Sequence, residues 1–245
     1  MTSSVEARPA ATVLLVRDRE ELEVLMVERH RDAHFASALV FPGGVVDPED
    51  SAAYWAQLAD EGEGLSAEQR ALRVAAFREL HEETGLLILD RARHGATGAE
   101  PSGDDFAASI RAHDARLDLS AMHHFAHWIT PEFAPKRFDT HFYLCGLETE
   151  VEPISDGRET VYVDWLTPAK ALELAAAGER QVMFPTRLNL ELLAQSRTVA
   201  EAIEAARSRR IVTITPWVEQ RGETRVIAIP EDAGYGAAFE VAGRG

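Results

Sequence analysis

Cysteine and long apolar runs are both nearly missing from this chain. Cys145 is its one cysteine, so no disulfide can form within the chain, which fits a reducing compartment. No apolar run approaches the ~18 residues that a membrane-spanning helix needs. The first residues lack the charged, apolar and small-residue succession of a signal peptide, and residues 240–245 do not end in a peroxisomal tripeptide. We therefore expect a cytoplasmic protein without a membrane partner.

Positive charge is also scarce. The chain has 25 Lys and Arg against 41 Asp and Glu, which gives a formal net charge of −16. Nucleic-acid binding needs a basic face, so we expect no nucleic-acid partner. A small anionic substrate is compatible with this charge if local Arg or Lys side chains and a bridging metal cation receive it.

The order of apolar and polar segments predicts a mixed α/β protein. The 245 residues suit one large globular domain, or a domain with extensions. Apolar, β-branched runs at 11–18 and 22–29 predict a hairpin or adjacent strands. The other predicted elements are strands at 86–90, 122–130, 138–146 and 159–166, helices at 51–60, 66–83, 104–117, 167–178, 185–195 and 198–209, a polar loop at 94–105, and two short strands in the tail. Such a mixture predicts an α/β sandwich and not a bundle or barrel.

The helix at 66–83 has the clearest signals. Ser66 and Gln69 match a capping box at its start, and Gly85 is a typical residue just past its end. Leu72 and Leu80 belong to an apolar stripe that repeats every four residues, which predicts the buried face of this helix.

Three glutamates crowd the end of the same helix: Glu79, Glu82 and Glu83. Carboxylates are disfavoured at a helix C-terminus, and Glu79 and Glu83 repel each other at i,i+4. On a helical wheel the three lie within an arc of about 100°, in the direction of the apolar stripe. A solvated acidic helix end would not explain this inward direction. The pattern instead predicts a site for a hard divalent cation, Mg²⁺ or Mn²⁺.

The stretch RELHEETGL, from Arg78 to Leu86, resembles the core of the Nudix box, the signature of the Nudix hydrolase superfamily. FPGGVVDPED resembles the preceding loop, with Gly44 as the box glycine and Asp50 where the family has glutamate. The 27 residues between Asp50 and Arg78 exceed the family spacing, so this alignment contains an insertion at about 51–70. Counting back without an insertion would put Arg70 at the glutamate position. A long insertion here resembles the branch that contains the peroxisomal coenzyme A diphosphatase, as do HWITPEFAPKRFDTHFYL, DWLTPAKAL and FPTRLNLELL.

This resemblance implies a Nudix α/β/α sandwich with a mixed sheet. The implied domains are a Nudix domain at 8–195, with its insertion, and a C-terminal extension at 196–245 packed on the same domain. The resemblance also implies that the three glutamates bind catalytic Mg²⁺ or Mn²⁺ ions, that Arg78 orients Glu79, and that Gly43 and Gly44 wrap the metal-binding loop around the helix end. The general base is either a glutamate of the box or Glu159, for which a surface acid at a strand start is an equal alternative.

The implied activity is metal-dependent hydrolysis of the diphosphate bond in a nucleoside diphosphate derivative, with coenzyme A or acyl-CoA among the candidates. Hydrolysis of NADH, ADP-ribose or dinucleoside polyphosphates is an alternative, as is a non-catalytic ligand sensor or an isomerase on the same fold. The intact box carboxylates favour hydrolysis. The sequence leaves a homodimer open.

The remaining candidate residues would contact the substrate. Arg29, Arg31 and Arg137 are candidate phosphate ligands, because arginine makes bidentate contacts to phosphate. Phe41 is a candidate to stack on a base, as are Trp128 and Phe138, and Gly43 and Gly44 follow Phe41 directly.

The histidines at 123, 124 and 127 do not predict a zinc site. Adjacent histidines of this group should point to opposite faces of a strand, so their spacing alone does not bring them together. Cys145 is predicted to be a core residue.

Overall fold

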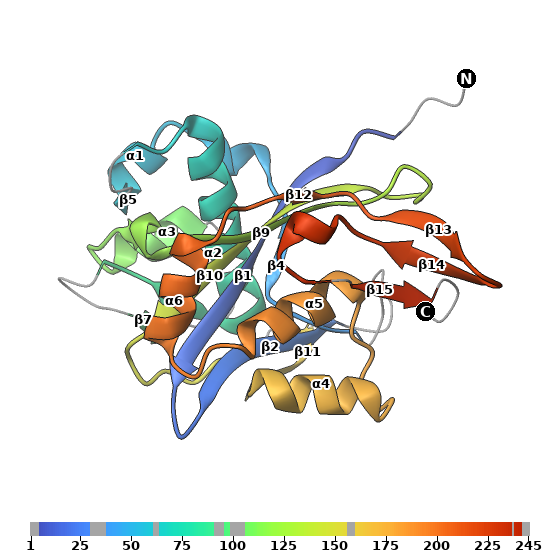
Figure 1. The fold of residues 1–245 in the computed structure, drawn as a ribbon. Coiled ribbons are helices and arrows are strands. Elements are labelled where there is room, and N and C mark those ends of the chain that lie inside the picture. Colours follow the sequence, from blue (N-terminus) through green and yellow to red (C-terminus); the bar gives the residue numbers. More distant parts are fainter. Residues whose placement is uncertain are drawn as a thin grey trace.

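The architecture is a mixed β-sheet with helices on both faces. The computed structural model describes residues 5–29, 38–60, 64–90, 96–98, 106–155, 160–236 and 238–241. The main sheet has the strand order β11-β2-β1-β10-β9-β12, with β3 paired to β2 and β4 paired to β1 (Figure 1). Pairs β1–β10 and β9–β12 are parallel, and the others are antiparallel. The strands are β1 (Arg8–Asp18), β2 (Leu22–Arg29), β3 (Leu39–Val40), β4 (Gly43–Val45), β9 (His123–Ile129), β10 (Phe138–Leu147), β11 (Thr160–Leu166) and β12 (Thr213–Ile214).

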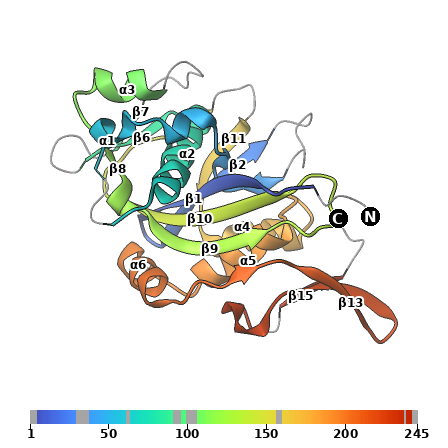
Figure 2. The same ribbon diagram turned by 90° about the horizontal axis from the view of Figure 1, so that it is seen from above.

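Figure 2 shows α1, α2 and α3 above the sheet and α4, α5 and α6 below it. Alternate residues of β1 supply a separate apolar core to each face: Val13 and Leu15 pack on the α2 side, and Leu14 and Val16 on the α5 side. The α/β sandwich with a mixed sheet is therefore confirmed. No helix in the described ranges is long and apolar enough to cross a membrane. The helices are α1 (Trp55–Leu58), α2 (Ala67–Thr84), α3 (Phe106–Ala112), α4 (Pro168–Ala176), α5 (Phe184–Leu193) and α6 (Val199–Ser208).

Helix α2 begins and ends where the sequence predicts. Ser66 Oγ accepts a hydrogen bond from the backbone N–H of Gln69 at 3.2 Å, and Gln69 Oε1 accepts one from the backbone N–H of Ser66 at 3.0 Å. Gly85 follows the helix with a φ of 70°, a left-handed conformation that glycine adopts without a Cβ clash. The predicted stripe is buried, and it holds α2 against β1 and β4. This packing fixes where the glutamates at the helix end lie.

The segments around α2 differ in detail from the prediction. The helix expected at 51–60 is only the short α1, preceded by a 3-10 helix (Pro48–Ser51) and followed by β5 (Ala59–Asp60). Strand β5 pairs with β8 (Leu117–Asp118), next to a second 3-10 helix (Leu119–Ala121). The loop expected at 94–105 contains β7 (Ala96–Gly98), which pairs with β6 (Leu86–Ile88). That prediction is wrong at 96–98, because pairing with a buried neighbour outweighs the polar composition of the segment.

The C-terminal segment contributes to both the sheet and the core. Strand β12 joins the main sheet, while β13 (Trp217–Arg221), β14 (Thr224–Ala228) and β15 (Phe239–Val241) form a separate antiparallel sheet, with a 3-10 helix (Glu231–Ala233) before β15. The prediction of two short strands in the tail gives too few, because the described residues of the tail form four strands. Pro216, which has no N–H to donate to a strand neighbour, separates β12 from β13. Ile214 and Ile229 are buried in the α5-side core, whereas the domain boundary at 195 stays a prediction.

Candidate active site

Arg78 is the centre of a carboxylate cluster at the end of α2. Its Nε and Nη2 donate to the two carboxylate oxygens of Asp50, each at 3.0 Å, and Asp50 is only 1% exposed. Its Nη1 donates to Glu79 Oε1 and to Glu82 Oε2, each at 2.9 Å. Burial alone would lower the pKa of Arg78, but the hydrogen bonds to Asp50 and the surrounding negative charges outweigh it and raise that pKa. Arg78 therefore stays charged and holds Glu79 and Glu82 in place.

The three glutamates differ in their surroundings. Glu83 is buried, and its Oε2 accepts a hydrogen bond from the backbone N–H of Gly43 at 3.2 Å. The side chains of Glu79 and Glu82 are 15% and 33% exposed. Burial raises the pKa of Glu82, with contributions from Asp50 and Asp47, although Arg78 acts in the opposite direction. The helical wheel predicts that all three glutamates face inward. Glu83 is buried as predicted, whereas Glu79 and Glu82 are only partly buried.

The turn at Gly43 and Gly44 closes over this cluster. Strand β4 lies beside β1, with Gly44 opposite Ala11, and a Cβ atom at Gly44 would overlap the carboxylate of Glu79. Glycine is thus required by the close approach of the backbone to Glu79. Asp50 lies just beyond this turn, and Arg78 also donates to the backbone carbonyl of Val45 at 3.0 Å. The loop and the helix end are consequently bound together by one guanidinium group.

A pocket of about 420 Å³ opens next to Glu79. Its wall is mainly apolar and aromatic, and Glu79 is the one charged side chain that lines it among the described residues. The lining comes from β1, the β3–β4 turn, β10 and the start of α5, and includes Phe41, Phe138, Phe142, Met183, Pro185 and Thr186. An apolar pocket with a carboxylate cluster at its side can hold a flat or aliphatic group while a charged group meets the cluster.

The predicted substrate residues have mixed outcomes. Phe41, Gly43, Gly44 and Phe138 line the pocket, but Trp128 does not: it packs against Phe184 and Tyr235 in the α5-side core. Arg137 does not line this pocket either, because its Nε and Nη1 donate to the backbone carbonyls of Thr130 and Val5 at 3.0 and 2.7 Å. Arg29 ends β2, but its side chain lies outside the described part of the structure, as do Arg31 and Glu159. Cys145 is buried, as predicted.

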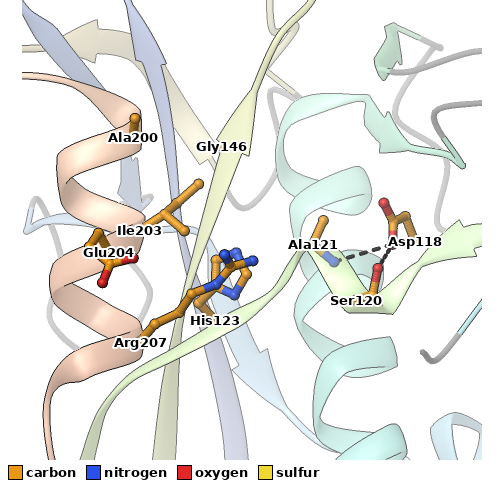
Figure 3. A pocket seen from close by; sticks show the side chains of 9 residues that line it. All are labelled: Asp118, Ser120, Ala121, His123, Gly146, Ala200, Ile203, Glu204 and Arg207. Atoms are coloured by element: carbon orange, nitrogen blue, oxygen red, sulfur yellow. Dashed lines mark hydrogen bonds between the residues drawn. The ribbon is translucent and has the colours of Figure 1, made fainter. Parts of the chain in front are cut away.

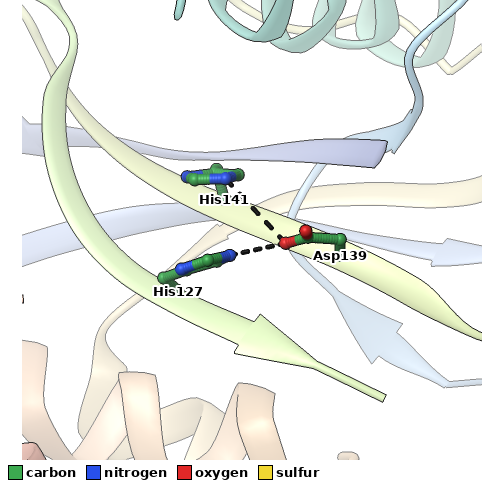
Figure 4. Close-up of side chains that lie close together, drawn as sticks. All are labelled: His127, Asp139 and His141. Carbon is green, nitrogen blue, oxygen red and sulfur yellow. Dashed lines mark hydrogen bonds and ion pairs between the residues drawn. The ribbon is translucent and has the colours of Figure 1, made fainter. Parts of the chain in front are cut away.

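The structure also brings together side chains that the sequence did not connect. His127, Asp139 and His141 converge on the α2 side of β9 and β10 (Figure 4). His123 and His124 do point to opposite faces, but a bulge in the β9–β10 register at Phe125 returns His127 to the face of His124. The prediction from histidine spacing was therefore incomplete. Only the cross-strand register, in which His127 lies opposite His141, could have revealed this group.

A second pocket, of about 450 Å³, lies between α6 and the ends of β9 and β10 (Figure 3). Figure 3 shows Arg207 of α6 and His123 of β9 reaching toward each other across it, with Asp118 and Ser120 on the far side. None of the glutamates of the α2 cluster lines this pocket. Its size alone does not make it the better candidate, because the carboxylate cluster lies at the other pocket.

Comparisons with known proteins identify the family of the chain. The sequence pattern of the NUDT19 Nudix domain family matches residues 59–191, more than half of the chain, and includes all of α2. The human acyl-coenzyme A diphosphatase NUDT19 is 25% identical over 81% of this chain and 68% of its own length. A putative nudix hydrolase 7 of Caenorhabditis elegans is 31% identical over 77% of this chain and 61% of its own length.

Among solved structures, a NUDIX hydrolase from Alicyclobacillus acidocaldarius superposes with a TM-score of 0.63 at 27% identity. That match covers 80% of this chain and 99% of the bacterial one. The Nudix resemblance and its fold are thus confirmed. This chain belongs to the NUDT19 Nudix domain family of Nudix hydrolases.

Proposed function

We propose that this protein is a Mg²⁺- or Mn²⁺-dependent diphosphatase that cleaves a nucleoside diphosphate derivative, with coenzyme A or an acyl-CoA as the leading substrate class. The observation that carries the proposal is the Arg78-centred cluster of Glu79, Glu82 and Glu83 at the side of an apolar pocket. The name of the human relative supports the substrate class, since that protein is an acyl-coenzyme A diphosphatase.

The residues present fit a hard divalent cation. Carboxylate oxygens are the ligands that Mg²⁺ and Mn²⁺ prefer, and the glutamates at this helix end supply them. The glycine at position 44 lets the carboxylate of Glu79 lie directly against the backbone of β4. Burial raises the pKa of Glu82, and the nearby charges of Asp50 and Asp47 add to this rise. A bound cation would offset this accumulation of negative charge. Glu79, Glu82 and Glu83 would hold the metal ions, which supply charge neutralisation for the diphosphate and a more acidic bound water.

The chain's own groups would then position the reaction. Arg78 keeps Glu79 and Glu82 oriented, and Asp50 keeps Arg78 oriented through both carboxylate oxygens. Gly43 holds Glu83 through its backbone N–H. The pocket between Phe41, Phe138 and Phe142 would receive an organic part of the substrate and exclude water from it. The proton acceptor is a glutamate of the cluster or Glu159.

The test is a product analysis. The purified protein is incubated with Mg²⁺ or Mn²⁺ and, separately, with coenzyme A, acyl-CoA, NADH, ADP-ribose and dinucleoside polyphosphates, and the products are identified by mass spectrometry. We expect turnover of coenzyme A or acyl-CoA at the diphosphate bond, and its loss on removal of the divalent ion with a chelator.

Matched variants locate the activity. Glu82→Gln and Glu83→Gln should each lower kcat/KM at least about a hundredfold, because each removes a carboxylate that would hold the metal ions that neutralise the diphosphate. Glu68→Gln, which changes an exposed acid in the first turn of the same helix, should leave kcat/KM unchanged. Binding of a nucleotide without any product would support the ligand-sensor alternative. Undiminished turnover by both cluster variants would refute the assigned site.

A further inference from the structure

His127, Asp139 and His141 place three metal-ligating atoms close together, away from the glutamate cluster. Asp139 Oδ1 lies 2.5 Å from His127 Nε2 and 3.9 Å from His141 Nε2. The two imidazole rings are stacked, with their centroids 4.0 Å apart and their planes 17° from parallel. Figure 4 shows both rings directed at the same carboxylate. Together the donor atoms lie within 4.8 Å of one another.

The other nitrogen of each ring is already engaged. His127 Nδ1 lies 2.8 Å from Thr213 Oγ1 of β12, and His141 Nδ1 lies 3.2 Å from His124 Nε2. Metal-binding histidines commonly use one nitrogen for the ion and the other for a partner that fixes the ring orientation. Here both rings have such a partner, and both leave Nε2 directed toward Asp139.

Hydrogen bonding alone does not account for this convergence. One proton can join His127 to Asp139, but the Nε2 atom of His141 is then 3.9 Å from the carboxylate, too far for a hydrogen bond. A cation between the three side chains would contact all of them. With bonds of about 2.0–2.1 Å in a tetrahedral arrangement, donor atoms lie about 3.3 Å apart. Reaching this spacing needs shifts of less than about 1 Å in the two distances to Asp139.

We propose that His127, Asp139 and His141 bind a divalent transition-metal ion of the Zn²⁺ or Co²⁺ type. Two imidazole nitrogens and one carboxylate oxygen suit such ions, whereas Mg²⁺ prefers a set of oxygens only. The side chains are between 15% and 36% exposed, so an ion can reach them and a solvent molecule can complete its coordination.

Bound metal would join three strands. His127 belongs to β9, Asp139 and His141 belong to β10, and Thr213 extends the contact to β12 of the C-terminal segment. An ion that binds the folded chain and not the unfolded one raises the melting temperature. The site lies two strands from Gly44, because Gly44, Ala11 and His141 are consecutive partners across β4, β1 and β10. At the usual strand spacing this is about 10 Å, so the ion would be separate from those at the glutamates.

Binding is tested on the metal-free full chain by isothermal titration with Zn²⁺, in an excess of Mg²⁺ that occupies oxygen-only sites. Co²⁺ serves as a second probe, because its visible absorption reports nitrogen ligation and low coordination number. We expect one equivalent of Zn²⁺ and a Tm that rises by several degrees. His141→Ala and Asp139→Asn should each weaken Zn²⁺ binding at least tenfold and abolish the Co²⁺ spectrum.

Two controls make the outcome decisive. His123→Ala removes the neighbouring histidine that points to the opposite face of β9, and it should keep wild-type Zn²⁺ affinity. Glu83→Gln should keep it too. The proposal is overturned if the wild type takes up no stoichiometric Zn²⁺, or if His141→Ala and Asp139→Asn bind it as the wild type does. Asp139→Asn preserves the size of the side chain, and circular dichroism verifies that each variant is folded.

Discussion

The two clusters of titratable side chains are built in opposite ways. The glutamate cluster comes from one turn of α2, with Arg78 four residues before Glu82, so its members are neighbours in sequence and in space. The histidine cluster comes from two strands, and His127 and His141 meet only because the β9–β10 register sets them opposite each other. One cluster offers only oxygen atoms and the other mostly nitrogen. The two proposed sites would thus suit different ions, a hard cation at the glutamates and a borderline one at the histidines.

Arg78→Gln should give the largest difference between its effects on the glutamate cluster and on the histidine cluster. It leaves the carboxylate of Asp50, 1% exposed, without its guanidinium partner. Loss of one partner from a buried ion pair costs about 3–5 kcal/mol, and we expect that decrease in the free energy of unfolding by urea denaturation. Hydrolysis should fall sharply as well, whereas Zn²⁺ uptake by the folded variant should persist.

The matched control for this change is Arg187→Gln. Arg187 pairs with Glu191 on the surface of α5 at 2.7 Å, and surface pairs contribute at most about 1 kcal/mol. Adding Asp50→Asn to Arg78→Gln should restore part of the stability, because the buried charge is then gone. Equal decreases in the free energy of unfolding for Arg78→Gln and Arg187→Gln would mean that burial does not increase the contribution of the Asp50–Arg78 ion pair to stability.

Gly44→Ala should impair the glutamate cluster without unfolding the chain. The new methyl group overlaps the carboxylate of Glu79 and displaces it. Since a misplacement of about 1 Å can cost a hundredfold in rate, we expect kcat to fall by about that factor. Steady-state kinetics across a Mg²⁺ titration measure it. In a Glu79→Gln background the same change should add little, and an additive loss would contradict the contact.

Thr213→Val should weaken only the histidine cluster. It removes the hydroxyl that lies 2.8 Å from His127 Nδ1 and keeps the shape of the side chain. Loss of an outer hydrogen-bond partner typically weakens metal binding about 10- to 100-fold, and we expect the lower end because Thr213 is exposed. Zn²⁺ titration measures the change. Thr213→Ser retains the hydroxyl and should bind as the wild type does; hydrolase activity should be the same in all three proteins.

Tyr235→Phe should have the smallest effect, at the second place where the C-terminal segment is attached. Tyr235 Oη donates to Asn189 Oδ1 of α5 at 2.5 Å, and burial raises its pKa from 10.0 to about 12. The folded state therefore holds this proton more tightly than the unfolded state. Its stabilisation is complete below pH 10.0 and is lost as the pH rises toward about 12.

The variant should lose about 1 kcal/mol of unfolding free energy at neutral pH and show a smaller decline between neutral and alkaline pH than the wild type. Urea denaturation at a series of pH values measures both. Tyr143 and Tyr162 also have a pKa raised to about 12, so part of the alkaline decline should persist in the variant. An unchanged alkaline profile would show that Tyr235 does not contribute to it.

Local signals made the glutamate cluster predictable. The capping box at Ser66 and the glycine at 85 determine the ends of α2, and the helical period then places the three acids together. The same holds for the β1–β2 hairpin and for the α/β class. These features depend on residues a few positions apart, where propensity and pattern agree.

Features that depend on distant residues were not predictable. A single extra residue at Phe125 decides which histidines share a face of β9, and nothing in the adjacent sequence marks it as a bulge. Arg137 is a candidate phosphate ligand by residue type, and no local sequence signal shows that the backbone carbonyls of Val5 and Thr130 accept hydrogen bonds from its guanidinium group. The pocket beside Glu79 draws its wall from β1, β10 and α5, whose meeting is set by the packing of the whole sheet.

The paired hydrogen bonds between Asp50 and Arg78 also affect how the length of the segment between them can vary. These hydrogen bonds join the chain before the predicted insertion at about 51–70 to α2, so the ends of the intervening segment are held together by a side-chain contact. The entropy of closing a flexible loop grows only logarithmically with its length, at about 0.6 kcal/mol for each doubling. Residues of this segment that do not pack on the core, unlike the buried Trp55 and Ala59, can therefore be added or removed at little thermodynamic cost. The positions of the glutamates at the end of α2 should therefore depend little on the length of the predicted insertion.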